Sequence, residues 1–232
     1  MAQAKGRLIC PLYRVGTPFE REDRIRIIVL QPRPFDEPVY VTRPMLPPLD
    51  EYTAELSKIW QSASLSNIGA LHQLLEEQLS KYLGTRFLSL FNNGTTALMV
   101  ACQALNLSGE VITTPFTFAA TPHTLIWNKI TPVFCDIDPE TLTINPGMIE
   151  SLITQQTTGI LGVHVYGMPC HVHAIQRIAD RYGLKVIYDG AHAFGTQLDG
   201  QPIADFGDMT MFSFHATKLF HTAEGGALAM QS

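Results

Sequence analysis

The feature that most constrains the fold is a regular alternation of strand-like and helix-like segments between residues 87 and 230. Short apolar runs rich in β-branched and aromatic residues alternate with longer segments whose apolar residues follow helical spacing. We expect strands at residues 87–91, 111–113, 131–137, 159–165, 184–188, 209–214 and 226–230, and helices at 95–106, 118–128, 146–153 and 172–182. Such an order is typical of right-handed βαβ units. The sequence therefore predicts an α/β fold with a mainly parallel sheet and helices on both faces.

The first 48 residues differ in composition from the rest of the chain. Eight of the 15 prolines lie in residues 1–48, which leaves no room for a helix between residues 31 and 48. We expect an extended N-terminal arm there. Helical spacing then begins at Leu49 and predicts a helix over residues 49–61 and a second over 71–82, which Gly84 ends. Residues 49–232 are thus expected to form one domain.

Composition and charge exclude several classes of protein. Charged residues make up 16% of the chain and the net charge is −5, with no basic stripe, so nucleic acid is not an expected partner. The most apolar run, residues 96–105, is too short to cross a membrane. None of the four cysteines forms a C-x-x-C pair, which suits a reducing cytoplasm. We expect a cytoplasmic protein.

The first predicted strand leads into Asn93-Gly94-Thr95-Thr96 at the start of a helix. In parallel sheets ligands bind beyond the carboxyl ends of the strands. A glycine followed by two hydroxyl residues at a helix N-terminus offers free N–H groups, the positive end of the helix dipole and side-chain donors to a phosphate. The alternative is an ordinary turn with a threonine cap. Because the run matches neither G-x-G-x-x-G nor the P-loop, the phosphate of another cofactor is the better hypothesis.

Two further predicted strands end in residues that suit a flat, protonated ring. The loop of residues 114–118 carries Phe118, which could stack on such a ring or pack in the core. Asp189 follows the buried run Val186-Ile187-Tyr188, and a buried carboxylate needs a partner. A protonated heterocycle would supply that partner, with His192 close by. The alternative is that Asp189 only caps the next turn.

Lys218 stands among small, aromatic and hydroxyl residues, after an apolar strand-like run. A lysine desolvated by aromatic neighbours and a glycine pair loses proton affinity and becomes an amine nucleophile. The alternative is a strand-end lysine whose amine reaches solvent. A metal site at Cys170-His171-Val172-His173 with His164 is a weaker hypothesis, because this segment opens a predicted helix and no fourth ligand has a motif-like spacing. We expect no metal.

Together these strand ends meet the requirements of pyridoxal 5′-phosphate. The lysine would hold the aldehyde as a Schiff base, the aspartate would keep the pyridine nitrogen protonated, and the helix N-terminus would anchor the phosphate.

Several motifs in order also resemble one known family. They are Asn93-Gly94-Thr95-Thr96-Ala97-Leu98, residues 115–118, 136–142, 164–167, 186–195 and 207–218, and Glu224-Gly225-Gly226. Over about residues 40–232 the chain resembles the DegT/DnrJ/EryC1/StrS family of PLP-dependent nucleotide-sugar aminotransferases, and the run around Lys218 is the most specific part of the resemblance.

The resemblance implies a fold type I, aspartate-aminotransferase-like large domain, normally in a homodimer with its sites at the interface. It implies that Lys218 binds the cofactor and moves protons, that Asp189 pairs with the pyridinium nitrogen, and that His192 contacts the ring or its phenolic oxygen. The phosphate would be bound by Gly94, Thr95, Thr96 and Ser213, and the ring stacked on by Phe118. The implied reaction transfers an amino group from an amino acid, usually glutamate, to a keto group of a dTDP- or UDP-linked deoxysugar.

One departure from the family's pattern is length. Family members continue into a smaller C-terminal domain, which we expect to be absent here because the chain stops 14 residues after Lys218. A non-catalytic remnant that binds PLP or a sugar nucleotide therefore stays open as an alternative. A dehydratase of the same family is a further alternative, but its best-known versions replace the Schiff-base lysine with histidine, so Lys218 counts against it. The sequence leaves the sugar, the nucleotide and the choice between C3 and C4 undecided.

Overall fold

A computed structural model describes residues 37–40, 42–66 and 68–231. The chain divides into two units, Met1–Val39 and Tyr40–Ser232, and the second, which is compact, contains all the elements below. Its helices are α1 (Leu49–Ser62), α2 (Ala70–Leu83), α3 (Gly94–Ala104), α4 (Ala120–Trp127), α5 (Pro146–Ile149) and α6 (Val172–Tyr182). Short 3₁₀ turns occupy Glu150–Leu152, Val165–Gly167 and Ile203–Asp205.

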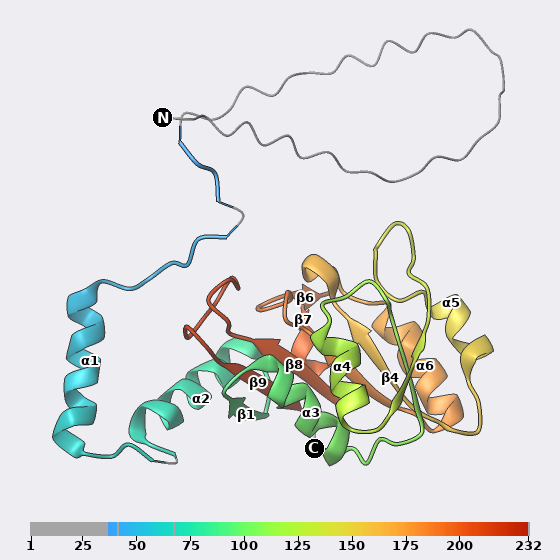
Figure 1. Ribbon diagram of the computed structural model, residues 1–232, viewed down its shortest axis with the longest axis horizontal. Helices are drawn as coiled ribbons and strands as arrows, with labels where there is room; N and C mark the ends of the chain where they lie inside the picture. Colours follow the sequence, from blue (N-terminus) through green and yellow to red (C-terminus); the bar gives the residue numbers. More distant parts are fainter. Residues whose placement is uncertain (1–36, 41, 67, 232) are drawn as a thin grey trace, which may run out of the picture. The chain divides into compact units, whose positions relative to one another are not determined.

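Strands β1 to β9 complete the second unit. They are β1 (Phe87–Phe91), β2 (Glu110–Thr113), β3 (Thr131–Phe134), β4 (Thr157–Val163), β5 (Lys185–Asp189), β6 (Gln197–Leu198), β7 (Gln201–Pro202), β8 (Met209–Ser213) and β9 (Gly226–Met230). Within the described residues, seven of these strands form one sheet in the order β1-β9-β8-β5-β4-β2-β3. Figure 1 labels β1, β9, β8 and β4 of this sheet. The pairs from β8 to β3 are parallel, and β9 runs antiparallel to both β8 and β1. The prediction of a mainly parallel sheet is confirmed.

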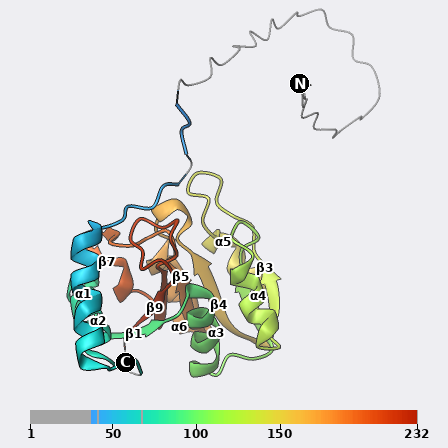
Figure 2. The ribbon, with the colours of Figure 1, turned by 60° about the vertical axis from the view of Figure 1, so that its left-hand side comes forward.

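Alternate side chains of each strand enter two separate hydrophobic cores. Ile160, Val186 and Phe212 point to one face, where they pack with residues of α2, α5 and α6. Their neighbours Leu161, Ile187 and Met211 point to the other face, against α3 and α4. Because side chains alternate along a strand, near-continuous apolar strands require helices on both faces. Figure 2 shows α3 and α4 in front of the sheet, and the prediction of helices on both faces is confirmed.

Gly84 ends α2 as predicted, whereas the residue that caps α3 is Asn93 and not a threonine. Gly84 adopts a left-handed conformation (φ 67°), and its N–H reaches back to the carbonyls of Lys81 and Ser80, which ends α2. Asn93 begins α3, since its side-chain Oδ1 accepts a hydrogen bond of 2.8 Å from the N–H of Thr96.

The predicted arm of residues 1–48 lies mostly outside the described residues. Its described part, residues 37–40 and 42–48, is exposed and has neither helix nor strand. The predicted helix over residues 49–61 is confirmed as α1. No helix in the described part of the chain combines the length and the apolar character that crossing a membrane requires.

Candidate active site

A pocket of about 750 Å³ opens at the carboxyl ends of the parallel strands. Residues that follow β1, β2, β4, β5 and β8 line it. Seven of the eight predicted site residues lie in its wall: Gly94, Thr95, Phe118, Asp189, His192, Ser213 and Lys218. Thr96 is not part of the wall, and its N–H is already bonded to the side chain of Asn93. The topology thus brings together residues that are 124 positions apart in the sequence, from Gly94 to Lys218.

The N-terminus of α3 forms one side of the pocket. Gly94 and Thr95 occupy its first turn, where backbone N–H groups precede the first intrahelical hydrogen bonds. Gly94 lies so close to β8 that a Cβ there would be 2.7 Å from Met211 Sδ and 3.2 Å from Ser213 Cβ. A helix N-terminus and the hydroxyl of Ser213 therefore face the same space, which is an arrangement that binds anions.

Asp189 forms the buried floor of the pocket. The last residue of β5, it is only 5% exposed. Its Oδ1 accepts the N–H of Ala191 at 3.0 Å, and its Oδ2 accepts the hydroxyl of Thr121 at 2.7 Å. Burial raises the pKa of this carboxyl, while the two hydrogen bonds and the charges of His192 and Lys218 oppose the rise. Asp189 thus caps the following turn, as the simpler alternative held, and also faces the pocket.

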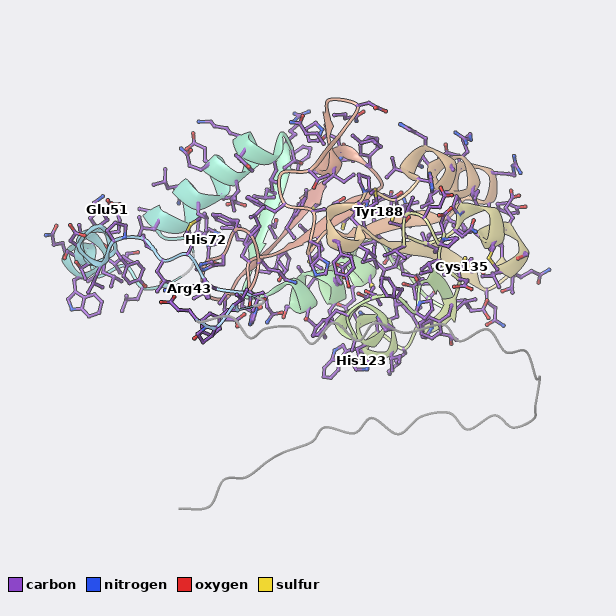
Figure 3. All side chains as sticks on the ribbon, turned by 90° about the horizontal axis from the view of Figure 1, so that it is seen from above. Arg43, Glu51, His72, His123, Cys135 and Tyr188 are labelled. Carbon is purple, nitrogen blue, oxygen red and sulfur yellow. The ribbon has the colours of Figure 1, made fainter. Side chains whose placement is uncertain are left out.

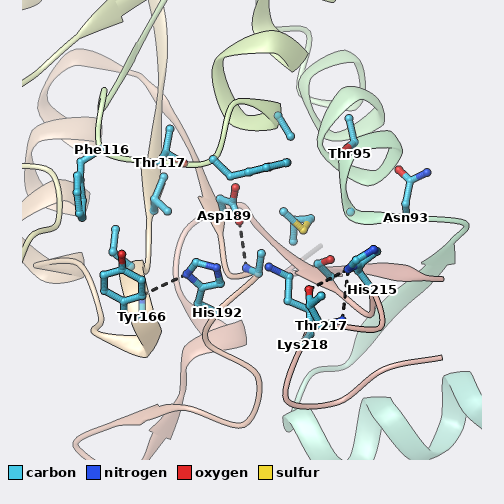
Figure 4. A pocket seen from close by; sticks show the side chains of 18 of the residues that line it. Asn93, Thr95, Phe116, Thr117, Tyr166, Asp189, His192, His215, Thr217 and Lys218 are labelled. Carbon is cyan, nitrogen blue, oxygen red and sulfur yellow. Dashed lines mark hydrogen bonds between the residues drawn. The ribbon is translucent and has the colours of Figure 1, made fainter. Parts of the chain in front are cut away.

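His192 is held in one tautomer. Its Nδ1 accepts the backbone N–H of Tyr166 at 3.3 Å, which leaves the hydrogen of the neutral ring on Nε2. The ring of Tyr166 stacks on it with centroids 5.7 Å apart and planes 1° from parallel (Figure 4). Burial, and then the charge of Lys218, lower the pKa of His192. The side chain therefore presents an N–H donor rather than a cation.

Lys218 lies in the loop between β8 and β9, not on a strand. Its side chain projects into the pocket on the side of Asp189 and His192 (Figure 4). The loop is closed at its base by hydrogen bonds from Phe214 N to Gly225 O (2.8 Å) and from Thr222 N to Phe214 O (3.0 Å). Below the loop, the buried ring of Phe214 meets that of Phe220 edge-on at 5.1 Å. Aromatic packing therefore fixes the loop that carries the half-buried lysine.

Three contributors to the site were missed from the sequence. Tyr166 has a left-handed backbone (φ 52°) that turns its ring onto His192. Thr117 and Thr121 are linked through their hydroxyls, 2.7 Å apart, and Thr121 reaches Asp189 across 68 residues of sequence. No periodicity marks these residues, although the His164–Gly167 motif that contains Tyr166 is part of the family resemblance.

The segment weighed as a metal site has another structure. The Nδ1 of His164 accepts the N–H of Cys170 at 3.0 Å, and the thiol of Cys170 donates to the carbonyl of Val163 at 3.2 Å. Within the described residues no group of three or more His, Cys, Asp or Glu side chains could hold a metal ion.

A model of the DegT/DnrJ/EryC1/StrS aminotransferase family matches residues 49–232. The chain belongs to this family. It is 52% identical over 197 residues to a dTDP-4-amino-4,6-dideoxy-D-glucose transaminase of Shigella dysenteriae, a match that covers 85% of this chain and 54% of that protein. It is 48% identical over 196 residues to the transaminase of the same name from Escherichia coli, with 83% and 52% covered. The chain thus spans about half the length of these DegT-family relatives.

Solved structures place the fold in the same family. DesI, crystallised in the presence of its TDP-sugar product, superposes with a TM-score of 0.83 at 39% identity, over 87% of this chain and 51% of DesI. NtdA of Bacillus subtilis with bound cofactor PMP superposes with a TM-score of 0.74 at 32% identity, over 79% of this chain and 42% of NtdA. The fold is that of the fold type I, aspartate-aminotransferase-like large domain, as predicted.

Proposed function

We propose that the protein is a pyridoxal 5′-phosphate-dependent aminotransferase that moves an amino group from an amino acid, glutamate in the first instance, to a keto group of a nucleotide-linked deoxysugar. The observation that carries this proposal is the convergence of Lys218 and the buried Asp189 on one pocket whose wall includes the N-terminus of α3. A carboxylate buried beside an open pocket calls for a cationic partner, and the protonated nitrogen of a pyridine ring fits that need.

The residues that we propose to hold the cofactor divide its three functional groups among them. Asp189 pairs with the pyridinium nitrogen, and the α3 N-terminus at Gly94 and Thr95 binds the phosphate together with Ser213. His192 offers its Nε2–H to the phenolic oxygen. Phe118, which is 76% exposed at the rim, covers the face of the ring. Thr96 remains in the proposal as a phosphate ligand through its side chain, since its N–H serves the helix cap.

Bound there, the cofactor supplies an electron sink that stabilises negative charge on a substrate carbon. Lys218 would hold the cofactor's aldehyde through Nζ, and the same nitrogen, as a free amine, would take up and release a proton beside the substrate carbon. The neutral His192 keeps its hydrogen on Nε2, so it would orient the cofactor's phenolic oxygen without competing for the proton that Lys218 takes up. Asp189, buried and acceptor-only when ionised, holds the ring nitrogen protonated.

For the substrate we propose a dTDP-linked 4-keto-6-deoxyglucose, aminated at C4. Support comes from two transaminases about half identical to this chain, whose names specify dTDP-4-amino-4,6-dideoxy-D-glucose. Because the chain spans only about half of their length, the activity, donor and sugar are all part of this proposal. The non-catalytic remnant considered from the sequence is the less favoured reading.

We also propose a homodimer with the pockets at its interface, in the cytoplasm. Two large apolar side chains that line the pocket, Phe118 and Tyr166, and Leu219, next to Lys218 in sequence, are 75% to 84% exposed, as expected of a surface that a second subunit covers. The cysteines in the described part of the chain, Cys102, Cys135 and Cys170, are free and buried, which suits a reducing compartment. Light scattering of the protein loaded with cofactor tests the dimer.

Two measurements on the purified protein test the proposed function. Added pyridoxal 5′-phosphate should give a visible absorption band that borohydride reduction fixes covalently, and Lys218→Ala should abolish it. Lys81→Ala, which removes an exposed lysine of α2, is the matched control and should keep the band. With the band established, transfer of an amino group from glutamate to the 4-keto sugar nucleotide should follow. Cofactor binding without transfer would support the remnant, and no band in the wild type would refute the cofactor.

A further inference from the structure

Asp189 is the end of a chain of hydroxyl groups that starts at the pocket rim. Thr121 lies in the first turn of α4, is fully buried, and places its Oγ1 2.7 Å from Asp189 Oδ2. The Oγ1 of Thr117, in the loop before α4, lies 2.7 Å from the Oγ1 of Thr121. Thr117 also lines the pocket, beside Phe116 (Figure 4), and precedes Phe118 in sequence. A carboxylate on β5 is thus connected to the aromatic rim through two side chains.

The chemistry of the groups sets the direction of these hydrogen bonds. An ionised carboxylate only accepts hydrogen bonds, so Thr121 must donate its single hydroxyl hydrogen to Asp189. Its oxygen then has only lone pairs to offer Thr117, which must act as the donor. Both hydroxyl hydrogens therefore point toward Asp189 while that residue is charged. If Asp189 were protonated, its own hydrogen could point outward and the direction could reverse.

We propose that Thr117 and Thr121 are positioning residues whose hydroxyl groups form a chain of hydrogen bonds directed toward Asp189, called here the relay. The relay fixes the Asp189 carboxylate and couples its charge to the conformation of the aromatic loop 114–118. The inference rests on the proposed function, because the carboxylate so fixed is the one assigned to the cofactor's ring nitrogen. Thr117 stands next to Phe118, the side chain proposed to cover that ring. The relay would thus link the carboxylate proposed to bind the ring nitrogen to the side chain proposed to cover the ring.

The other groups around Asp189 do not duplicate the relay. The N–H of Ala191 serves Oδ1, whereas Thr121 serves Oδ2. The charged or titratable neighbours are His192 and Lys218 from the pocket side and the buried thiol of Cys170 from the core side. Among the hydrogen bonds of the described residues, Thr121 is the side chain that donates to the carboxylate. Removing its hydroxyl should therefore leave Oδ2 without a protein donor.

The first test uses the protein without cofactor. The hydrogen bond from Thr121 lowers the pKa of Asp189, so its loss raises that pKa further. The unfolded carboxyl titrates near pH 4, so at higher pH the folded state can bind a proton that the unfolded state does not bind. On acidification, the free energy of unfolding should therefore begin to rise at a higher pH in Thr121→Val than in the wild type. In an Asp189→Asn background the same substitution should leave the pH dependence unchanged. Equal effects in both backgrounds would overturn the relay.

The second test adds pyridoxal 5′-phosphate. We expect Thr121→Val to weaken cofactor binding about 10-fold and to shift the pH titration of the bound cofactor's absorbance. Thr121→Ser, which keeps the hydroxyl, should restore both. Thr117→Val, at a half-buried position where folding is not at risk, should produce a smaller shift in the same direction. If the Ser and Val variants of Thr121 behave alike, the hydroxyl is not the cause and the relay is wrong.

A matched control lies one turn away on the same helix. Thr124 is buried like Thr121, but its hydroxyl donates to the carbonyl of Thr121 at 2.8 Å and not to the carboxylate. Thr124→Val should therefore leave cofactor affinity and its pH titration as in the wild type, and a matching loss there would contradict the inference. Wild-type protein that fails to bind the cofactor would refute the proposed function, while the cofactor-free measurements would still decide the relay.

Discussion

Replacing His164 should change how the stability of the protein depends on pH. His164 follows β4, and its ring is fully buried and stacked on Tyr188 with centroids 4.6 Å apart. Nδ1 accepts the N–H of Cys170, whereas Nε2 is buried with no hydrogen-bond partner among the described residues. Burial lowers the pKa of the ring to about 3. In His164→Asn, the amide oxygen can still accept the N–H of Cys170, but the titrating group is gone.

The sign and size of the effect follow from the two pKa values. The unfolded histidine binds a proton below about pH 6.5, and the folded one refuses it down to about pH 3. Stability of the wild type therefore falls as the pH falls through this window, by about 1 kcal/mol per pH unit. Between pH 6 and pH 4 the loss amounts to about 2 kcal/mol. The variant escapes this loss but loses the stacking on Tyr188 at every pH.

Urea unfolding at a series of pH values, followed by far-ultraviolet circular dichroism, measures the difference. We expect the wild type to be the more stable protein at pH 7 and its advantage over His164→Asn to shrink by about 2 kcal/mol from pH 6 to pH 4. His123→Asn is the control, because His123 is exposed on the outer side of α4. Tyr188, on which His164 stacks, lies instead among the packed side chains (Figure 3). A difference between wild type and His164→Asn that stays constant with pH would refute the argument from burial.

Two further predictions concern the N-terminus of α3. Asn93→Ala should cost about 1 kcal/mol of stability and weaken cofactor binding, whereas Asn145→Ala, which removes the cap of α5 at 2.9 Å, should cost a similar amount without affecting the cofactor. Gly226→Ala should lower the melting temperature strongly, because the added Cβ would lie 2.6 Å from the backbone of Asn93 and Gly94. Gly69→Ala has room, with the nearest atoms 3.9 Å away, and should change the melting temperature little. A Gly226→Ala variant that melts close to the wild-type temperature would contradict the close approach of Gly226 to Asn93 and Gly94.

The elements of the fold were largely predictable because burial on both faces gives each strand a continuous apolar run. β1, α6 and β9 begin and end where the sequence predicted. The predicted strand over residues 159–165 ends early, at Val163, because the chain turns into the 3₁₀ segment Val165–Gly167, where Tyr166 has a positive φ of 52°. The hydrogen bond from His164 N to Asp189 O at 3.0 Å is the last of the β4–β5 pairing. The β6–β7 hairpin was missed although Asp199-Gly200 between its strands, both with positive φ, is a strong hairpin signal.

The candidate site divides into a predictable and an unpredictable part for a physical reason. Strand ends are readable from sequence, and in a parallel sheet they meet at one edge, so Asp189 and Lys218 could be expected to share a pocket. Which helix side chains reach that edge depends on how the helices pack. Thr121 looks like any small residue of α4 until packing places it against β5. Tyr166 depends on a left-handed backbone that nothing in its neighbours requires.

The position of β9 between β8 and β1 has a consequence for the order in which the molecule assembles. Its pairing with β1 joins Phe87 to Met230, residues separated by 143 positions, and its first residue, Gly226, rests on the backbone of Asn93 and Gly94. Contacts so distant in sequence form late, since closing a long loop costs entropy before any contact repays it. The anion-binding end of α3 should therefore be completed in one of the last folding steps. Until β9 docks, β1 and β8 expose unpaired edges, and aggregation should compete with folding at that stage.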